Sequence, residues 1–253
     1  MSRSKIAALS VAAAVGGMMI VPAWAASTLS ASFFKVVGDP AFGTQCCGTY
    51  GDMVTGTLGP DGLPVLNTSA PDIPVAFMNT LKGDLNSNGE LTWWTPGPHV
   101  TATGSSTVSL PFSSASMYPP AATPGGNDAN GYLSAMFTGI FSLATASMVN
   151  FSLGADDDAF FYVDNTLVNS IGGIHGDTPA PVTTTSLGQG THTIKLFYDD
   201  RQPSAAALDF NLTSQGITII PSVPEPSTFA LLGVGLTGLG FLRRRSKCRS
   251  EKS

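Results

Sequence analysis

Hydrophobic residues in the central part of the chain alternate with polar residues over short stretches. Val149, Phe151 and Leu153, for example, are separated by an asparagine and a serine. Successive side chains of a β-strand point to opposite faces of the sheet, so this period of two indicates half-buried strands. Gly, Pro, Asn and Asp bound most of the stretches, as is typical of turns. The pattern predicts strands over residues 29–37, 53–58, 73–78, 91–94, 99–103, 108–112, 133–143, 148–153, 159–163, 167–171, 182–187, 191–198, 208–212 and 217–220.

No convincing amphipathic segment of about twelve residues or more shows the period of a helix in this central part. Residues 26–220 are therefore predicted to form an all-β domain, a single β-sandwich or jelly-roll-like barrel, which is long for one domain but within the range of such folds. Residues 113–130 are rich in Ser, Pro and Gly and are predicted to be a long loop without regular structure.

Residues 1–25 have the pattern of a secretory signal peptide. Arg3 and Lys5 precede an apolar run over residues 6–21, and Ala23-Trp24-Ala25 provides small residues at a cleavage site. Cleavage after Ala25 would start the mature chain at Ala26. The apolar run is shorter than the ~20 residues that span a bilayer, which argues against an uncleaved anchor.

The carboxyl-terminal end combines three features in a fixed order. A linker over residues 221–226 contains Pro224, Glu225 and Pro226, residues 227–242 carry no charge, and Arg243, Arg244 and Arg245 open a basic tail over residues 243–253. A helix over residues 227–242 would be about 24 Å long, close to the ~30 Å hydrocarbon core of a membrane. With arginines as a positive-inside stop, the pattern predicts a short transmembrane helix and a cytoplasmic tail.

This arrangement, "VPEPSTFALLGVGLTGLGFLRRRSK", closely resembles the PEP-CTERM sorting signal. The resemblance implies recognition by an exosortase, a membrane cysteine protease, with the inner membrane as a transient location. It also implies export to the cell surface or extracellular matrix of a Gram-negative bacterium. An ordinary membrane anchor is the alternative, and it would leave the protein equally outward-facing.

Charge narrows the classes of partner. Only 11% of the residues are charged, and residues 26–226 hold four basic against sixteen acidic side chains, a net charge of −12. A domain of this sign favours divalent cations and disfavours nucleic acid and anionic lipid surfaces.

Acidic residues gather after several predicted strands. Asp156, Asp157 and Asp158 are consecutive, and adjacent carboxylates repel one another unless a cation or hydrogen bonds compensate. Calcium suits such a group because it takes about six to eight oxygen ligands. The candidate metal ligands are Asp156, Asp157, Asp158, Asp199 and Asp200, with His175 and Asp177 as candidate ligand-binding residues. A solvated acidic turn is the alternative.

The segments "GADDDAFFYVDNTLVNSIGGIHG" and "LGQGTHTIKLFYDDRQ", with "GTLGPDGLPVL" upstream, resemble the fibro-slime domain. That family is related to the protective-antigen-type β-sandwich of bacterial toxins, glycosidases and yeast adhesins. In its sugar-binding adhesin branch, two consecutive aspartates and loop residues hold a calcium ion that grips sugar hydroxyls. The resemblance assigns that role to two of Asp156, Asp157 and Asp158. The chain departs from the family pattern in having Asp164-Asn165-Thr166 at the hairpin and Asp200 in place of Glu.

Two other patterns favour structural roles. The stretch "GDLNSNGEL" imitates the start of a calcium loop, but Thr95 stands where a bidentate Glu belongs, so a polar turn is favoured. Trp93 and Trp94 would point to opposite faces of a strand, and core packing is the default expectation for them.

Together these observations predict an exported, noncatalytic surface or matrix protein, associated with biofilm or exopolysaccharide and binding carbohydrate through calcium. The sequence contains no nucleophile elbow, phosphate loop or zinc-protease helix. Two alternatives remain open. One is a secreted polysaccharide hydrolase that uses two of the clustered carboxylates, and the other is a purely structural coat protein.

Overall fold

The structure is a computed structural model that describes residues 28–43, 48–117, 130–203, 205–212, 214 and 217–220. The predicted signal peptide, linker, sorting helix and basic tail lie outside the described residues, as does most of the predicted loop over residues 113–130. Among the helices of the described part, none has the length and apolar character needed to cross a membrane.

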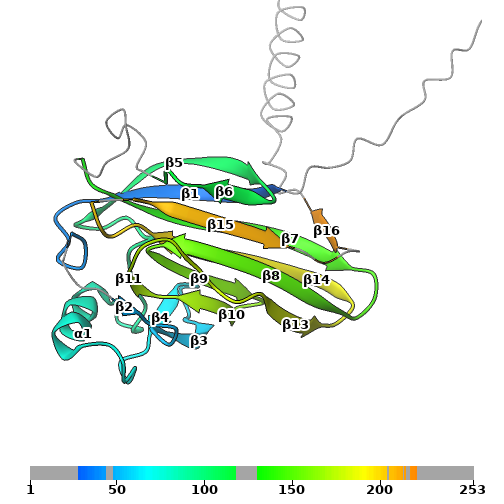
Figure 1. The fold of residues 1–253 in the computed structure, drawn as a ribbon, viewed down its shortest axis with the longest axis horizontal. Coiled ribbons are helices and arrows are strands. Elements are labelled where there is room, and N and C mark those ends of the chain that lie inside the picture. Colours follow the sequence, from blue (N-terminus) through cyan, green and yellow to red (C-terminus); the bar gives the residue numbers. More distant parts are fainter. Residues whose placement is uncertain are drawn as a thin grey trace, which may run out of the picture.

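Antiparallel strands dominate the described residues and form two main sheets (Figure 1). The larger sheet of the described part has nine strands, in the order β4 (Pro64–Leu66), β3 (Val54–Leu58), β10 (Thr166–Ile171), β9 (Asp158–Val163), β14 (Gly190–Asp199), β7 (Tyr132–Leu143), β1 (Thr28–Val36) and β5 (Val100–Ser109), with β16 (Ile217–Ile220) also paired to β7. The smaller sheet contains β12 (Thr178–Pro179), β8 (Ser147–Asp156), β15 (Ala207–Leu212) and β6 (Phe112–Ser114), with β13 (Thr183–Leu187) paired to β8. A short pair joins β2 (Gly48–Thr49) to β11 (Gly173–Ile174). The predicted all-β, sandwich-like class is confirmed.

Strand β9 lies in the middle of the larger sheet and is buried on both of its faces. Phe161 points toward the smaller sheet, where its ring centroid lies 4.7 Å from Phe151 and 4.9 Å from Phe210. Phe160 belongs to a second apolar cluster, in which it packs against Trp94 with a centroid distance of 6.3 Å. After its first residue the strand is a continuous apolar run, and its successive side chains point into two different cores rather than alternately into a core and solvent.

The stretch predicted as a strand over residues 73–78 is instead the helix α1 (Val75–Leu81), followed by the 3₁₀ turn η1 (Lys82–Asp84). Pro74 precedes the first helical residue, where the fixed φ of proline and its missing N–H are tolerated. Phe77, Met78 and Leu81 are the buried residues, with the spacing of one helix face.

The stretch predicted as a strand over residues 91–94 is a turn. Trp93 is 0% and Trp94 is 3% exposed, so both indoles are buried. This confirms the prediction that the two tryptophans pack in the core. Outside a strand, adjacent side chains are free to point to the same side. The predicted strands over residues 99–103 and 108–112 are divided differently in the structure: β5 continues from Val100 through Ser109, and β6 begins at Phe112 in the other sheet. β6 ends at Ser114 and so includes the first two residues of the predicted loop.

The hairpin between β9 and β10 uses the residues expected for a tight turn. Asp164 and Asn165 have φ values of 50° and 62°, a left-handed conformation that Asp and Asn tolerate better than most residues. Asp164 also accepts a hydrogen bond from the backbone N–H of Thr193 at 2.8 Å, which ties the hairpin to β14.

His192 and Asp164 form an ion pair beside this hairpin. His192 Nδ1 lies 2.6 Å from Asp164 Oδ2, and Nε2 lies 2.9 Å from the carbonyl oxygen of Gly188, so a protonated ring donates to both. The hydrogen bond to Asp164 raises the pKa of His192, although burial opposes it. Burial alone would raise the pKa of Asp164, but the hydrogen bond from His192 helps to bring it below its ordinary value.

We expect this pair to make the stability depend on pH. The contribution of His192 is present below its ordinary pKa of 6.5 and is lost as pH rises through the higher pKa of the folded state, whereas that of Asp164 is lost only as pH falls below 3.8. The His192→Gln variant should lose more unfolding free energy near about pH 5.5 than near about pH 8.5, by less than ~1 kcal/mol because Asp164 is partly exposed. Urea unfolding at both pH values measures this, and an equal loss at both would show that the pair is not ionic.

Candidate functional site

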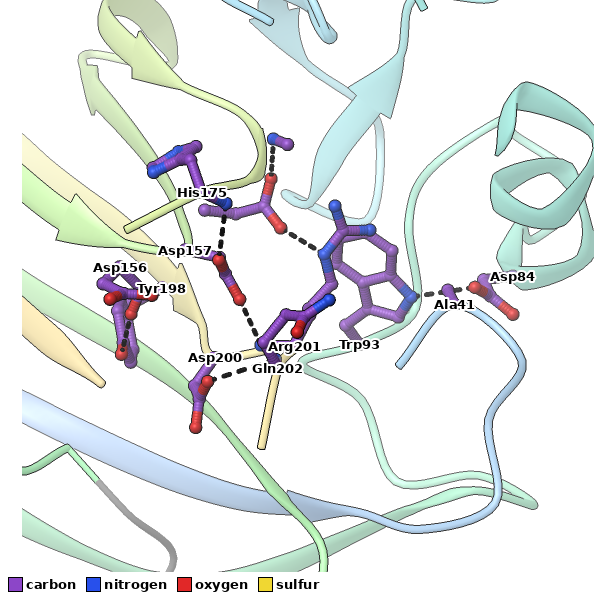
Figure 2. Close-up of polar contacts among 12 residues, drawn as sticks. Ala41, Asp84, Trp93, Asp156, Asp157, His175, Tyr198, Asp200, Arg201 and Gln202 are labelled. Atoms are coloured by element: carbon purple, nitrogen blue, oxygen red, sulfur yellow. Dashed lines mark hydrogen bonds and ion pairs between the residues drawn. The ribbon is translucent and has the colours of Figure 1, made fainter. Parts of the chain in front are cut away.

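The acidic residues that are far apart in the sequence meet at one end of the sandwich. Asp156 ends β8, Asp158 begins β9 and Asp199 ends β14. Asp158 lies opposite Asp199 in the strand pairing, and Asp199 lies opposite Ser134 of β7. The sheet register therefore brings residues 156–158 beside residues 199–201 (Figure 2).

Asp157 connects three segments at this end. Its Oδ1 accepts a hydrogen bond from the backbone N–H of His175, and its Oδ2 accepts one from the backbone N–H of Arg201, both at 2.8 Å. Its own N–H donates to the carbonyl oxygen of Asp199 at 3.2 Å. These bonds fix the orientation of the carboxylate and leave further lone pairs on both oxygens (Figure 2).

Asp158 is committed to an ion pair inside the protein. Its Oδ2 lies 2.6 Å from Nε of Arg201, and both side chains are 0% exposed. Its Oδ1 accepts a hydrogen bond from the backbone N–H of Gly173 at 2.6 Å. The carbon at the centre of the Arg201 guanidinium lies 4.8 Å from the ring centroid of Phe77 and 5.0 Å from that of Trp93. The sequence analysis placed Asp158 among the candidate ligands and did not foresee Arg201 as its partner.

Burial governs the titration of the inner carboxyls. It raises the pKa of Asp158 to about 7, although the charge of Arg201 acts in the opposite direction. It also raises the pKa of Asp199 well above its ordinary value, and the charge of Asp158 raises it further. Asp200 is also 0% exposed, and its Oδ1 accepts a hydrogen bond from the backbone N–H of Gln202 at 3.4 Å. Asp199 and Asp200 thus lie inside the domain.

Asp156 and Asp157 form a close carboxyl pair. Burial raises the pKa of Asp156 to about 7, and the charge of Asp157 and the hydrogen bond between the two side chains raise it further, while the backbone N–H of Asp177 lowers it. Asp177 thus reaches the pair through its backbone and is itself exposed. The ring of His175 turns to its own loop, with Nδ1 2.9 Å from the carbonyl oxygen of Gly176.

The structure separates the predicted metal ligands into those with partners inside the domain and the pair Asp156 and Asp157. Within the ranges that the structure describes, no three or more His, Cys, Asp or Glu side chains are grouped so that they could hold a metal ion. Asp158 faces Arg201 and Asp199 lies beside Ser134, while Asp156 and Asp157 remain together. A cation at this end would therefore take Asp156 and Asp157 as its acidic ligands, with backbone carbonyl oxygens and water completing its shell.

The calcium-like stretch over residues 83–91 forms a polar turn. Asn86 Nδ2 donates to Asp61 Oδ2 at 2.9 Å and to Glu90 Oε2 at 2.6 Å. Asn86 Oδ1 accepts the backbone N–H groups of Asn88 and Glu90, which fixes the orientation of the amide. The amide group of Asn86 thus bridges the carboxylates of Asp61 and Glu90. The polar turn is the interpretation that the sequence analysis favoured for this stretch.

Comparison with protein families identifies one motif. The PEP-CTERM protein-sorting motif matches residues 222–245, which is where the proline-bounded motif, the uncharged segment and the arginines stand. This motif defines an exported protein that is sorted through a membrane-anchored stage in Gram-negative bacteria. It also implies processing by an exosortase. The comparison with curated proteins gives no match.

Several solved structures resemble part of the chain. The PA14 sugar-binding domain from RTX adhesin is 22% identical, with a TM-score of 0.29 over 35% of this chain and 51% of that one. The epithelial adhesin 9 A domain from Candida glabrata, in complex with Galβ1-4GlcNAc, is 13% identical, with a TM-score of 0.35 over 76% and 84%. A family 35 carbohydrate binding module from an environmental isolate is 17% identical, with a TM-score of 0.29 over 44% and 91%. The chain thus spans about half the length of the first of these structures.

Proposed function

We propose that the chain is an exported, noncatalytic protein of the cell surface or matrix that binds carbohydrate through a calcium ion held by Asp156 and Asp157. The observation that carries this proposal is the pair of consecutive buried carboxyls at the end of the sandwich, of which Asp157 is oriented by two backbone N–H groups. Two adjacent buried carboxylates repel each other when both are ionised, and a divalent cation relieves that repulsion. The resemblance of residues 151–201 to the fibro-slime domain supports a site at the same triplet, because it assigns the role to two of Asp156, Asp157 and Asp158.

The surroundings of the pair suit a cation site. Asp157 is held by two backbone N–H groups and Asp156 by one, so both carboxylates are oriented before any ligand arrives. A bound calcium ion would supply open coordination positions for sugar hydroxyl groups. The loop that carries His175 and Asp177 borders the pair and would contribute carbonyl oxygens or contacts to the sugar.

The same geometry supports a noncatalytic role over a glycoside hydrolase. Hydrolases of that kind hold their two carboxyl groups about 5–10 Å apart, with room for the sugar between them. Asp156 and Asp157 are consecutive and are 2% and 0% exposed, which leaves no room for a sugar between their carboxyl groups. Release of reducing sugar from matrix polysaccharide, lost in the Asp157→Asn variant, would contradict this part of the proposal.

Calcium titration of the full-length protein in mild detergent tests the metal. We expect a Kd of roughly 1 mM or tighter, and loss of the binding heat in the Asp157→Asn variant. Asp72→Asn is the matched control, because it removes the same charge from an exposed aspartate elsewhere in the domain. Unchanged heat in Asp157→Asn would refute the assignment. Normal export without retention of any glycan would favour the structural coat protein.

A further inference from the structure

A pocket of about 390 Å³ lies beside Asp84, the residue that accepts a hydrogen bond from the indole N–H of Trp93. Asp39, Asp84 and His99 line it together with Thr95, Pro96 and Pro98. It lies apart from the Asp156–Asp157 pair, which does not contribute to its walls. Its volume is in the range of small-molecule pockets, about 300–1,000 Å³.

Each of the two carboxylates in this pocket is held by one donor. Asp39 is 6% exposed, and its Oδ1 accepts a hydrogen bond from the backbone N–H of Ala41 at 2.8 Å. Asp84 Oδ2 accepts one from Trp93 Nε1 at 3.0 Å. Among the described residues, the second oxygen of each carboxylate has no hydrogen-bond partner, so both carboxylates are oriented and each keeps one oxygen open.

No ion pair neutralises the two carboxylates of this pocket within the described residues. No lysine or arginine lines it, and neither Asp39 nor Asp84 takes part in a salt bridge within the described residues. Burial raises the pKa of Asp84 to about 6 despite the hydrogen bond from Trp93; the charge of Asp39 adds to this rise, and the charges of Arg201 and His99 reduce it. Two carboxylates that share a half-enclosed space without an ion pair repel each other, so a cationic ligand that contacts both would be stabilised there.

The lining indicates which kind of cation fits. An ammonium group carries three N–H donors, which match the open oxygens of Asp39 and Asp84. Pro96 and Pro98 provide an apolar wall for the C–H face of a ring, and Thr95 and His99 provide polar groups for hydroxyls.

We infer that this pocket binds the ammonium group of a glucosamine unit, such as those of a partly deacetylated polysaccharide. The inference extends the proposed carbohydrate binding to a second site, but it does not depend on calcium. Together the two sites would allow the domain to contact a polysaccharide at two points.

The test is calorimetry of the full-length protein in mild detergent with a tetramer of glucosamine, in the presence of EDTA. We expect binding that weakens about tenfold or more in Asp39→Asn and in Asp84→Asn, since each variant removes a charge-assisted hydrogen bond. Asparagine still accepts the bond from Ala41 or Trp93, so both variants should fold, and their unfolding midpoints verify this. Asp72→Asn is again the control for charge and should bind like the unchanged protein.

The tetramer of N-acetylglucosamine should bind at least about tenfold more weakly, because it lacks the ammonium groups. Equal affinity for the two tetramers, no binding of either, or displacement by lysine amide at equal concentration would overturn the inference. Binding that disappears with EDTA or in Asp157→Asn would also overturn it, because the sugar would then sit at the calcium pair, and the proposed function would stand.

Discussion

Replacing Arg201 by methionine is expected to lower the free energy of unfolding by about 3–5 kcal/mol. The substitution removes the cation that lies 2.6 Å from Asp158 and leaves that carboxyl fully buried without its partner. It also removes the guanidinium that stacks between Phe77 and Trp93, a contact that only a planar cation makes on both rings. Urea unfolding followed by tryptophan fluorescence measures the change.

Two further variants separate the ion pair from simple loss of charge. Lys82→Met removes a positive charge from an exposed position and should change the unfolding free energy by less than about 0.5 kcal/mol. The double variant Arg201→Met with Asp158→Leu should recover much of the loss, because an apolar pair leaves no buried charge uncompensated. If Arg201→Met cost no more than Lys82→Met, the pair would not hold this end of the sandwich together.

The sequence predicted the strands well where alternation is continuous over several residues. The last strand, β16, has the predicted bounds, because Ile217–Ile220 alternates and stands between turn residues. The helix α1 was mistaken for a strand because seven residues are too few to display a helical period. Its true signal was Pro74 followed by buried positions spaced as on one helix face.

The acidic triplet was found in the sequence, but the different roles of its members were not. All three carboxyls are buried, and the partner that each one meets depends on the pairing of β9 with β14, a long-range contact that composition does not reveal. One signal for the Asp158 partner was available, since Arg201 is the only arginine between residues 26 and 226 and follows two aspartates. In a domain of net charge −12, such an arginine is best placed against a carboxylate.

The Asp39–Asp84 pocket could not have been predicted, because its residues come from separate loops and no motif unites them. Trp93 joins it physically to the first site, since one side of the indole stacks on Arg201 and its N–H binds Asp84. The buried contact of Asp158, Arg201 and Trp93 therefore connects the two candidate sites without lining the pocket. Damage to this contact would disturb both sites, so the ligand tests rely on variants outside it.

Truncating Phe161 to alanine is expected to lower the free energy of unfolding by about 3–5 kcal/mol. Phe161 is fully buried, and its ring lies within 5 Å of both Phe151 and Phe210, which belong to the smaller sheet. The substitution would leave a cavity where the two sheets meet, and close-packed neighbours on strands can fill it only in part. Ile140→Ala is the control, because Ile140 is 41% exposed on β7 of the same sheet and should cost far less. Similar losses for the two variants would show that contact between the sheets at Phe161 contributes little to the stability of the sandwich.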